Sequence, residues 1–244
     1  MIDIHCHILP DFDDGASNLD EALEMAEMAA NSGVTDIIAT PHFRGEISFW
    51  DKQDMIERRF QTLSAAIQRS DIPVQLHLGA EILCLPETAK MAANHQLPTL
   101  AGTDYVLTEF YFNESFNFMD DILFHIAQCG YKPVIAHPER YSSIQRAPDL
   151  LQHWADQGYV LQLNKGSVLG ELGFRAEQTA NEILSMGLAH LFASDAHHSY
   201  TRTPHTGALR HWVNECCDDG YAAALLRDNP KCLLQNRPIS TSDW

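Results

Sequence analysis

Short apolar runs alternate with longer amphipathic segments along most of the chain. Seven runs have strand character, at about residues 2–7, 36–41, 74–81, 105–110, 132–137, 159–164 and 188–194. Most are followed by a segment with helical periodicity, and these segments lie at about residues 18–32, 51–70, 86–95, 118–129, 147–157, 174–186 and 205–219. The repeated strand–helix order predicts an α/β fold built on parallel strands.

The apolar character of the strands and the absence of a linker favour one domain. The runs IIAT, PVIAH and LFAS are apolar throughout, as parallel strands covered on both faces should be. No Ser/Pro-rich stretch interrupts the alternation. We therefore expect a single-domain (β/α)7 barrel over residues 1–244, with its active site at the C-terminal ends of the strands. The alternative is an open doubly wound sheet, which would gather residues from only a few strands.

Imidazole and carboxylate side chains gather where the predicted strands end. His5 and His7 share one face of the first strand because strand side chains alternate, and the acidic turn DFDDG follows. Spacing does not separate Asp13 from Asp14 in this turn, and we favour Asp14. Six of the seven strands end in such residues, which makes nine candidates for one site: His5, His7, Asp14, His42, Glu81, Glu109, His137, Asp195 and His197.

Nine such side chains at one rim predict a metal centre. A single His or Asp at a strand end is usually an ordinary hydrogen-bonded residue, but crowded carboxylates repel one another and are costly to desolvate. Divalent cations relieve this repulsion. Nitrogen and oxygen donors without cysteine suit Mn, Fe or Zn. Cys6 points to the opposite face of its strand from His5 and His7, so we assign it to packing.

Composition and missing motifs exclude several classes of protein. The formal net charge of −17 argues against a nucleic-acid partner. No apolar run reaches the roughly 18–20 residues that span a bilayer, and no signal-peptide pattern is present, so we expect no membrane insertion. The six cysteines lack CxxC or disulfide spacing, which favours a cytoplasmic location. The chain has no Cys-x5-Arg, GxxxxGK or GxSxG motif, so we expect no cysteine or serine nucleophile.

A set of motifs in a fixed order resembles a known superfamily. Residues 1 to about 215 contain HCHILPDFDDGA, TPHF, GAEI, IAHPERY, QLNKGSVLGELG and SDAHH. This order resembles the PHP (polymerase and histidinol phosphatase) superfamily, and within it the bacterial CpsB-type capsule and exopolysaccharide tyrosine-protein phosphatases. The resemblance implies a PHP-type barrel and metal-dependent hydrolysis of phosphotyrosine. Family members commonly carry Ser at the position of Cys6, which is not a ligand position.

The resemblance also implies roles for individual residues. It implies three divalent metal ions, with Mn as the first choice and Fe or Zn as alternatives. The implied ligand sets are His5, His7, Glu81 and Asp195 for one ion, Glu81, Glu109 and His137 for the second, and Asp14, His42 and His197 for the third. The implied phosphate-binding residues are Arg140 and Arg202, which we also predict to be catalytic, while Arg44 is a weaker candidate for substrate binding.

The implied partner is a phosphotyrosine protein, namely the Tyr-rich tail of a tyrosine kinase from the same polysaccharide cluster. The aromatic segments 41–50 and 109–118 either flank the phosphotyrosine ring or pack on their own side chains. His198 or a metal-bound water could assist the leaving group. One alternative function is a small-molecule phosphomonoesterase, such as a histidinol phosphatase. Another is a metal-dependent phosphodiesterase or nuclease, against which the net charge argues.

Overall fold

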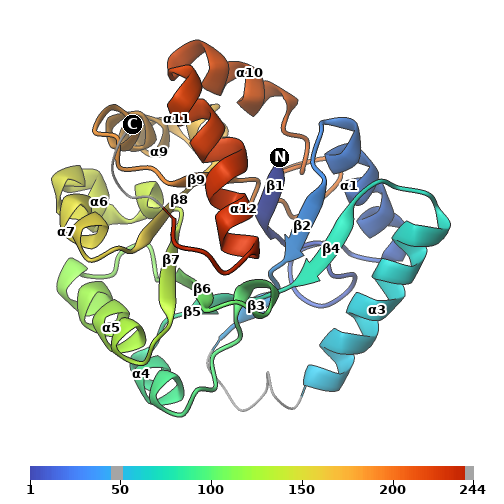
Figure 1. Ribbon diagram of the computed structural model, residues 1–244, viewed down its shortest axis with the longest axis horizontal. Helices are drawn as coiled ribbons and strands as arrows, with labels where there is room; N and C mark the ends of the chain where they lie inside the picture. Colours follow the sequence, from blue (N-terminus) through green and yellow to red (C-terminus); the bar gives the residue numbers. More distant parts are fainter. Residues whose placement is uncertain (45–51, 240–244) are drawn as a thin grey trace.

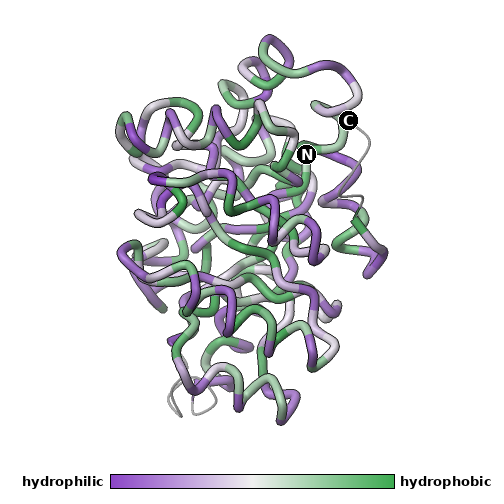
Figure 2. Tube along the Cα trace, turned by 90° about the vertical axis from the view of Figure 1, so that its left-hand side faces the viewer, coloured by the Kyte–Doolittle hydropathy of each residue, from purple (hydrophilic) through white to green (hydrophobic). Residues whose placement is uncertain are grey.

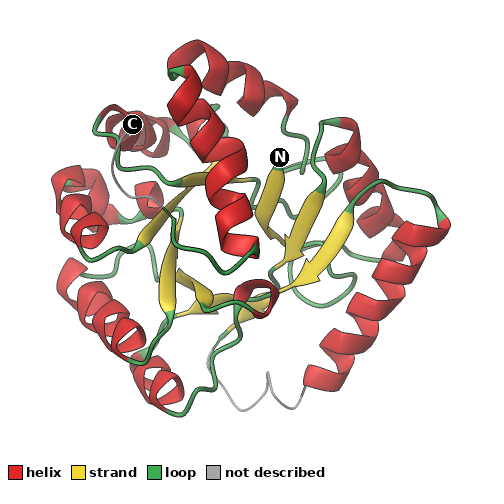
Figure 3. Ribbon diagram, in the orientation of Figure 1, coloured by secondary structure: helices red, strands yellow, loops and turns green. Residues whose placement is uncertain are grey.

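Parallel strands lie inside a surrounding layer of helices in the computed structural model of the protein, which describes residues 1–44 and 52–239 (Figures 1 and 3). The strands are β1 (Ile2–Cys6), β2 (Asp36–Ala39), β3 (His42–Phe43), β4 (Gln75–Leu78), β5 (Glu81–Leu83), β6 (Tyr105–Glu109), β7 (Lys132–Ala136), β8 (Val160–Asn164) and β9 (Leu191–Ala193). Every pairing between them is parallel. The predicted α/β class is therefore confirmed.

The helices largely follow the predicted segments. They are α1 (Leu19–Asn31), α3 (Gln53–Arg69), α4 (Pro86–Ala93), α5 (Phe116–Gln128), α6 (Ser142–Arg146), α7 (Leu151–Asp156), α8 (Lys165–Val168), α9 (Phe174–Ser185), α10 (Gly207–Cys216), α11 (Asp219–Ala223) and α12 (Asn229–Leu234). The Asn18 side chain caps α1 by accepting a hydrogen bond from the backbone N–H of Glu21. Among the described residues, no helix is both long enough and apolar enough to cross a membrane.

The strands form two sheets, and the chain passes from the first to the second after β2 and again after β4. One sheet has the order β1-β2-β4 and the other β3-β5-β6-β7-β8-β9. The run predicted over 36–41 contains β2, and β3 begins beyond it at His42, after Pro41, which has no backbone N–H to donate. The run predicted over 74–81 becomes β4 and β5. Gly79 lies between them, where a Cβ atom would be 2.8 Å from a Leu100 side-chain atom and 2.9 Å from one of Ile38.

Hydrogen bonds link the two sheets at the C-terminal ends of their strands. The backbone N–H of Asp195 donates to the carbonyl of His5 at 2.9 Å, and that of His7 donates to the carbonyl of Ala196 at 2.8 Å. The N–H of Glu81 donates to the carbonyl of Pro41 at 3.1 Å as part of the β3–β5 pairing, just after the chain passes from one sheet to the other. The first and last strands therefore lie side by side, which brings residues near both ends of the chain to one rim.

The C-terminal segment packs across the opposite end of the strands. Leu233 of α12 and Ile239 belong to a buried cluster that contains Ile2 and Ile4 of β1, and α12 lies in front of the strands in Figure 1. The Tyr105 hydroxyl donates to the carbonyl of Arg237 at 2.8 Å. In Figure 2 hydrophobic segments run through the interior, while the outer turns are mainly hydrophilic. The C-terminal rim of the strands is therefore the end left for a site.

His190, before β9, should make stability depend on pH. Its ring Nδ1 accepts a hydrogen bond from the N–H of Leu161 at 3.0 Å, and burial lowers its pKa to about 4. An unfolded histidine has a pKa of about 6.5, so between these values only the unfolded chain binds the proton. The free energy of unfolding should fall as pH falls through this window, by up to about 3 kcal/mol.

His190→Asn should flatten that dependence, because the Asn oxygen can still accept from Leu161 but does not titrate. The measurement is denaturant unfolding of chelator-treated protein between about pH 4 and 7. His211→Asn on the exposed side of α10 is the matched control and should keep the wild-type slope. Equal slopes for wild type and His190→Asn would show that this histidine does not set the pH dependence.

Candidate metal centre

The structure brings all nine predicted His, Asp and Glu side chains together at the C-terminal rim of the strands. Each has a nitrogen–oxygen contact of 3.1 to 3.8 Å with another member of the set. His137 and Asp195 follow β7 and β9 with φ of 35° and 48°, in the left-handed region. Such a backbone costs about 1–3 kcal/mol in a residue other than glycine and is concentrated at functional sites.

Glu81 lies at the centre of the cluster. Its Oε1 atom is 3.2 Å from His5 Nε2 and 3.1 Å from His137 Nε2, while its Oε2 atom is 3.2 Å from His7 Nε2 and 3.1 Å from His42 Nδ1. Burial alone would raise the pKa of Glu81, but His5 and the other imidazoles outweigh burial and hold that pKa well below its usual range. One ionised carboxylate therefore contacts four imidazoles, two of them from the end of β1.

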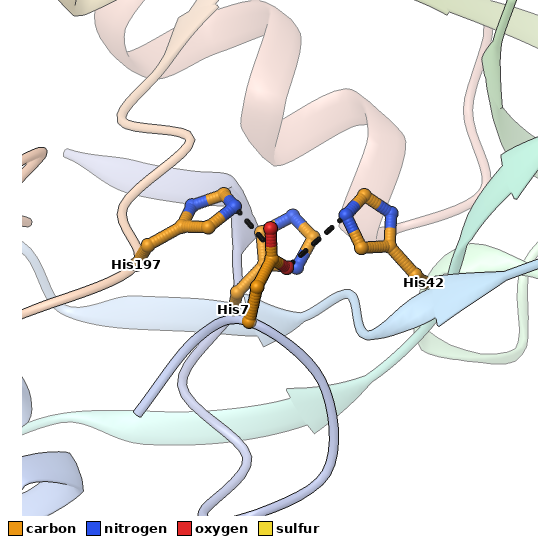
Figure 4. Close-up of side chains that lie close together, drawn as sticks. His7, His42 and His197 are labelled. Atoms are coloured by element: carbon orange, nitrogen blue, oxygen red, sulfur yellow. Dashed lines mark ion pairs between the residues drawn. The ribbon is translucent and has the colours of Figure 1, made fainter. Parts of the chain in front are cut away.

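Three groups within the cluster have the spacing of metal ligands. Their donor atoms lie within 4.8 Å of one another, and the groups are His5, His7 and Glu81; His42, Glu81 and Glu109; and His7, Asp14, His42 and His197. Figure 4 shows the rings of His7, His42 and His197 facing one another. His7 and His42 each belong to two of these groups. In the ligand sets implied by the resemblance each of them binds one ion, so the groups and the implied sets differ. The division of ligands among ions stays a prediction.

The donor set fits divalent cations. Two donors bound at about 2.1 Å in tetrahedral geometry lie roughly 3.4 Å apart. The Nε2 atoms of His5 and His7 are 3.3 Å apart, and His5 Nε2 is 3.4 Å from Asp195 Oδ1. His42 Nδ1 is buried, and its contact with the Glu81 carboxylate at 3.1 Å is the kind that a shared cation would replace. Imidazole nitrogens and carboxylate oxygens that converge at these distances are what a metal ion would bind.

His5 and Glu109, two of the candidate ligands, have raised pKa values. Burial would lower the pKa of His5, but Glu81 and Asp195 outweigh burial and raise it to about 9. Burial, with the negative charge of Glu81, raises the pKa of Glu109 to about 7. Since metal ligands must be deprotonated, a binding cation would displace these protons.

The structure separates the two acids that spacing left open. Asp13 lies beside the cluster: its Oδ2 atom is 2.9 Å from His7 Nδ1 and accepts the backbone N–H of His42 at 3.0 Å. Asp14 reaches into the cluster, where its Oδ1 atom is 3.3 Å from His42 Nε2 and 3.6 Å from His197 Nε2. Asp13 therefore orients the His7 ring and fixes the backbone at His42. The turn requires Gly15, because a Cβ atom there would lie 2.0 Å from the carbonyl oxygen of His7.

Two of the three predicted arginines lie at the same site. They help to line a cavity of about 200 Å³, whose described residues are Asp14, His42, Glu81, Glu109, Phe112, His137, Arg140, Asp195, His197 and Arg202. Arg202 Nη2 is 2.6 Å and Arg140 Nη1 is 3.4 Å from Asp195 Oδ2. Arg44 is exposed and is not among these residues. The cavity therefore combines a candidate cation cluster with two guanidinium groups.

The aromatic side chains of the two segments differ in what they contact. In segment 109–118, Phe112 lines the cavity, with the Arg140 guanidinium 4.3 Å from its ring centroid. Phe116 instead stacks on Trp154 at 4.9 Å and packs within the protein. In segment 41–50, Phe43 is buried, and residues 45–50 lie outside the described residues.

Two further predicted side chains lie away from the cavity lining. His198 is 3.2 Å from Glu21 of α1 through its Nδ1 atom, and its ring stacks on Tyr200. Cys6 is fully buried, and burial raises the pKa of its thiol well above the ordinary value. A buried neutral thiol agrees with a packing role for Cys6.

Comparison with known proteins places the chain in a family. The family model for capsular polysaccharide synthesis, CpsB/CapC, matches residues 1–235. The chain belongs to the CpsB/CapC family. It is 35% identical to the tyrosine-protein phosphatase YwqE of Bacillus subtilis, over 98% of this chain and 93% of YwqE. It is 29% identical to the tyrosine-protein phosphatase CpsB of Streptococcus agalactiae serotype III, over 98% of this chain and all of that protein.

A solved structure supports the same placement in the CpsB/CapC family. The crystal structures of YwqE from Bacillus subtilis and CpsB from Streptococcus pneumoniae include a chain that matches this one with a TM-score of 0.87 and 34% identity, over 98% of this chain and 96% of the other. Those two proteins are metal-dependent tyrosine phosphatases. The predicted resemblance is confirmed.

Strand β8 carries polar residues at the site for which no role was predicted. Gln162 contacts His5, Asn164 contacts Asp195, and Glu139 accepts hydrogen bonds from the N–H of Asn164 and from Ser167. The available signal was the pair of amides within the apolar run VLQLN, because buried polar side chains need partners.

Proposed function

We propose that this CpsB/CapC family member is a metal-dependent protein-tyrosine phosphatase. The observation that carries the proposal is one cavity in which candidate metal donors and two arginines face the same space. Arginines bind phosphate oxygens, and carboxylate–imidazole clusters bind divalent cations. The family relatives YwqE and CpsB, which are tyrosine-protein phosphatases, support the substrate class.

The proposed cofactor is a set of three divalent ions, with Mn as the first choice and Fe or Zn as alternatives. The three ligand-spaced groups support this number, and the proposed ligands are the nine residues predicted from the sequence. When bound, the ions would neutralise phosphate charge and lower the pKa of water towards 7, which supplies a nucleophile at neutral pH.

The two arginines are proposed to bind and orient the phosphate. Both guanidinium groups form ion pairs with Asp195 Oδ2 in the structure. A phosphate dianion in the cavity would compete with that oxygen for the two arginines. Two guanidinium groups can neutralise the equatorial oxygens as charge develops in the transition state. Phe112, beneath Arg140, holds that guanidinium from one side. Arg44 is left as a candidate for contacts outside the cavity.

The leaving group favours phosphotyrosine over phosphoserine. A tyrosine phenol has a pKa of about 10, so its phenolate leaves without a strong general acid. This agrees with the placement of His198, which lies against Glu21 rather than in the cavity lining. Phe112 is 42% exposed at the cavity and can contact the substrate ring.

The proposal includes the architecture and the cellular setting. We propose that the two sheets join into one (β/α)7 barrel and that residues 1–244 form a single domain. The hydrogen bonds between β1 and the end of β9, and the packing of Leu233 against β1, support this. The proposed partner is the Tyr-rich tail of a polysaccharide-cluster tyrosine kinase, and the proposed location is the cytoplasm. The net charge of −17 argues against nucleic acid as substrate.

A panel of phosphorylated substrates tests the proposed function. On one metal-loaded preparation we expect kcat/KM for a phosphotyrosine peptide to exceed that for the matched phosphoserine peptide by at least about tenfold, because a phenolate is the better leaving group. We expect histidinol phosphate to be the poorer substrate than the phosphotyrosine peptide. A preference for histidinol phosphate would favour the small-molecule phosphomonoesterase instead.

A further inference from the structure

Strand β8 supplies none of the nine predicted metal ligands, yet its polar side chains lie against the cluster. Gln162 and Asn164 are 0% and 1% exposed, while the alternating Leu161 and Leu163 belong to the large hydrophobic core. Because side chains alternate across a strand, both amides face the side on which His5 and Asp195 lie. Two fully buried amides in an apolar strand need a physical reason, since buried polar groups without partners are costly.

The two amides form a chain of hydrogen bonds between two candidate ligands. His5 Nδ1 is 2.9 Å from Gln162 Oε1, Gln162 Nε2 donates to Asn164 Oδ1 at 2.8 Å, and Asn164 Nδ2 donates to Asp195 Oδ2 at 2.6 Å. Both the oxygen and the NH₂ group of Gln162 and of Asn164 therefore have a hydrogen-bond partner.

The carboxylate at one end fixes the direction of every bond in the chain. Ionised Asp195 can only accept, so Asn164 must present its NH₂ group to it and its oxygen to Gln162. Gln162 must then present its NH₂ group to Asn164 and its oxygen to His5. An amide oxygen can only accept, so His5 Nδ1 carries a proton, and His5 Nε2 is the nitrogen that would present its lone pair to a bound cation.

The same chain divides the two oxygens of Asp195 between different partners. Oδ2 lies 2.6 Å from Asn164 Nδ2 and 2.6 Å from Arg202 Nη2. Oδ1 is 3.4 Å from His5 Nε2 and 3.6 Å from His197 Nδ1. Donors therefore occupy one oxygen and leave the other facing the histidines.

We propose that Gln162 and Asn164 are positioning residues of the metal centre. Gln162 holds His5 in the tautomer and ring orientation that present Nε2 to a cation, and Asn164 holds Asp195 with Oδ1 turned to the same point. This inference rests on the metal centre proposed above. Partners that orient metal ligands in this way commonly change metal affinity by about 10–100-fold.

Substitutions at Gln162 test the proposal through metal affinity. Gln162→Met has a similar shape without the amide, and its dissociation constant for at least one Mn or Zn ion, measured by chelator competition, should rise about 10–100-fold. Gln162→Glu keeps an oxygen towards His5 Nδ1 but loses the donor to Asn164, so its affinity should lie between those of Gln162→Met and wild type. Asn229→Leu is the matched control: it removes a buried amide that donates to the His190 carbonyl at 2.7 Å, and its affinity should equal that of wild type.

Nuclear magnetic resonance of zinc-loaded protein labelled with ¹⁵N-histidine gives a second readout. His5 of the wild type should show a protonated Nδ1 that exchanges slowly with water, and Gln162→Met should lose this protection. Absence of a proton on His5 Nδ1 in the wild type would overturn the proposal, even if Gln162→Met did not fold.

The measured metal affinities distinguish a failure of the positioning role from a failure of the proposed function. If wild type and Gln162→Met bind ions equally well, the positioning role is wrong and the metal centre stands. If the wild-type protein binds no divalent ion, the proposed function itself fails.

Discussion

Glu81→Gln should reduce kcat/KM for a phosphotyrosine peptide by at least about 10³-fold, equivalent to roughly 4 kcal/mol. Glu81 is the one carboxylate that contacts four imidazoles of the cluster, His5, His7, His42 and His137. An amide offers one neutral oxygen in place of two charged ones, so more than one ion would lose a ligand. The measurements are steady-state kinetics at saturating Mn and metal content by elemental analysis, and both should fall together.

Three comparisons decide whether Glu81 acts through the metal. Glu87→Gln on α4 is an exposed control with the same chemical change and should keep wild-type kinetics and metal content. Thermal unfolding of both variants in chelator checks that Glu81→Gln still folds. Thiol alkylation should leave the wild-type rate nearly unchanged, because Cys6 and Cys84 are buried. A folded Glu81→Gln variant with full activity would contradict the central role of this carboxylate.

Much of the fold could be predicted because parallel strands have a strong signature. The runs around β7 and β9 are apolar throughout, and all seven predicted runs contain strands. The divisions after β2 and β4 were missed because they depend on tertiary packing. Pro41 could have indicated the first, whereas Gly79 is required by the approach of Leu100 and Ile38, which are distant in sequence. The order of strands in the two sheets could not be predicted either, because it depends on which distant segments pair with each other.

The candidate ligands could be predicted from the sequence, whereas the polar residues that contact them could not. His and acid residues at strand ends follow from period-two alternation and parallel topology, so residues such as Glu109 and Asp195 were identified without contacts. Asp13 and Asp14 are adjacent in a turn, where alternation gives no information, and only contacts to His7 and His42 separate them. The link from Gln162 to His5 joins residues 157 positions apart, which no local pattern encodes.

Arg140→Ala should lower kcat/KM by about 10²–10³-fold while leaving metal content unchanged. The residue lines the cavity and its guanidinium contacts Asp195 Oδ2 at 3.4 Å, but an arginine has no lone pair for a cation. The loss should therefore appear in phosphate recognition. A charged contact that strengthens in the transition state is worth about 3–4 kcal/mol, which corresponds to this range of rates. Inorganic phosphate should also inhibit the variant more weakly than it inhibits wild type.

Two matched variants define what Arg140 contributes. Arg140→Lys keeps the charge but not the planar fork, so its activity should lie between those of wild type and Arg140→Ala. Arg146→Ala on α6 removes an arginine six positions away that is not among the described residues of the cavity, and it should stay within about twofold of wild type. Near-normal turnover of Arg140→Ala would show that Arg202 alone holds the phosphate. A parallel loss of bound metal would instead show that Arg140 acts by holding Asp195 in place.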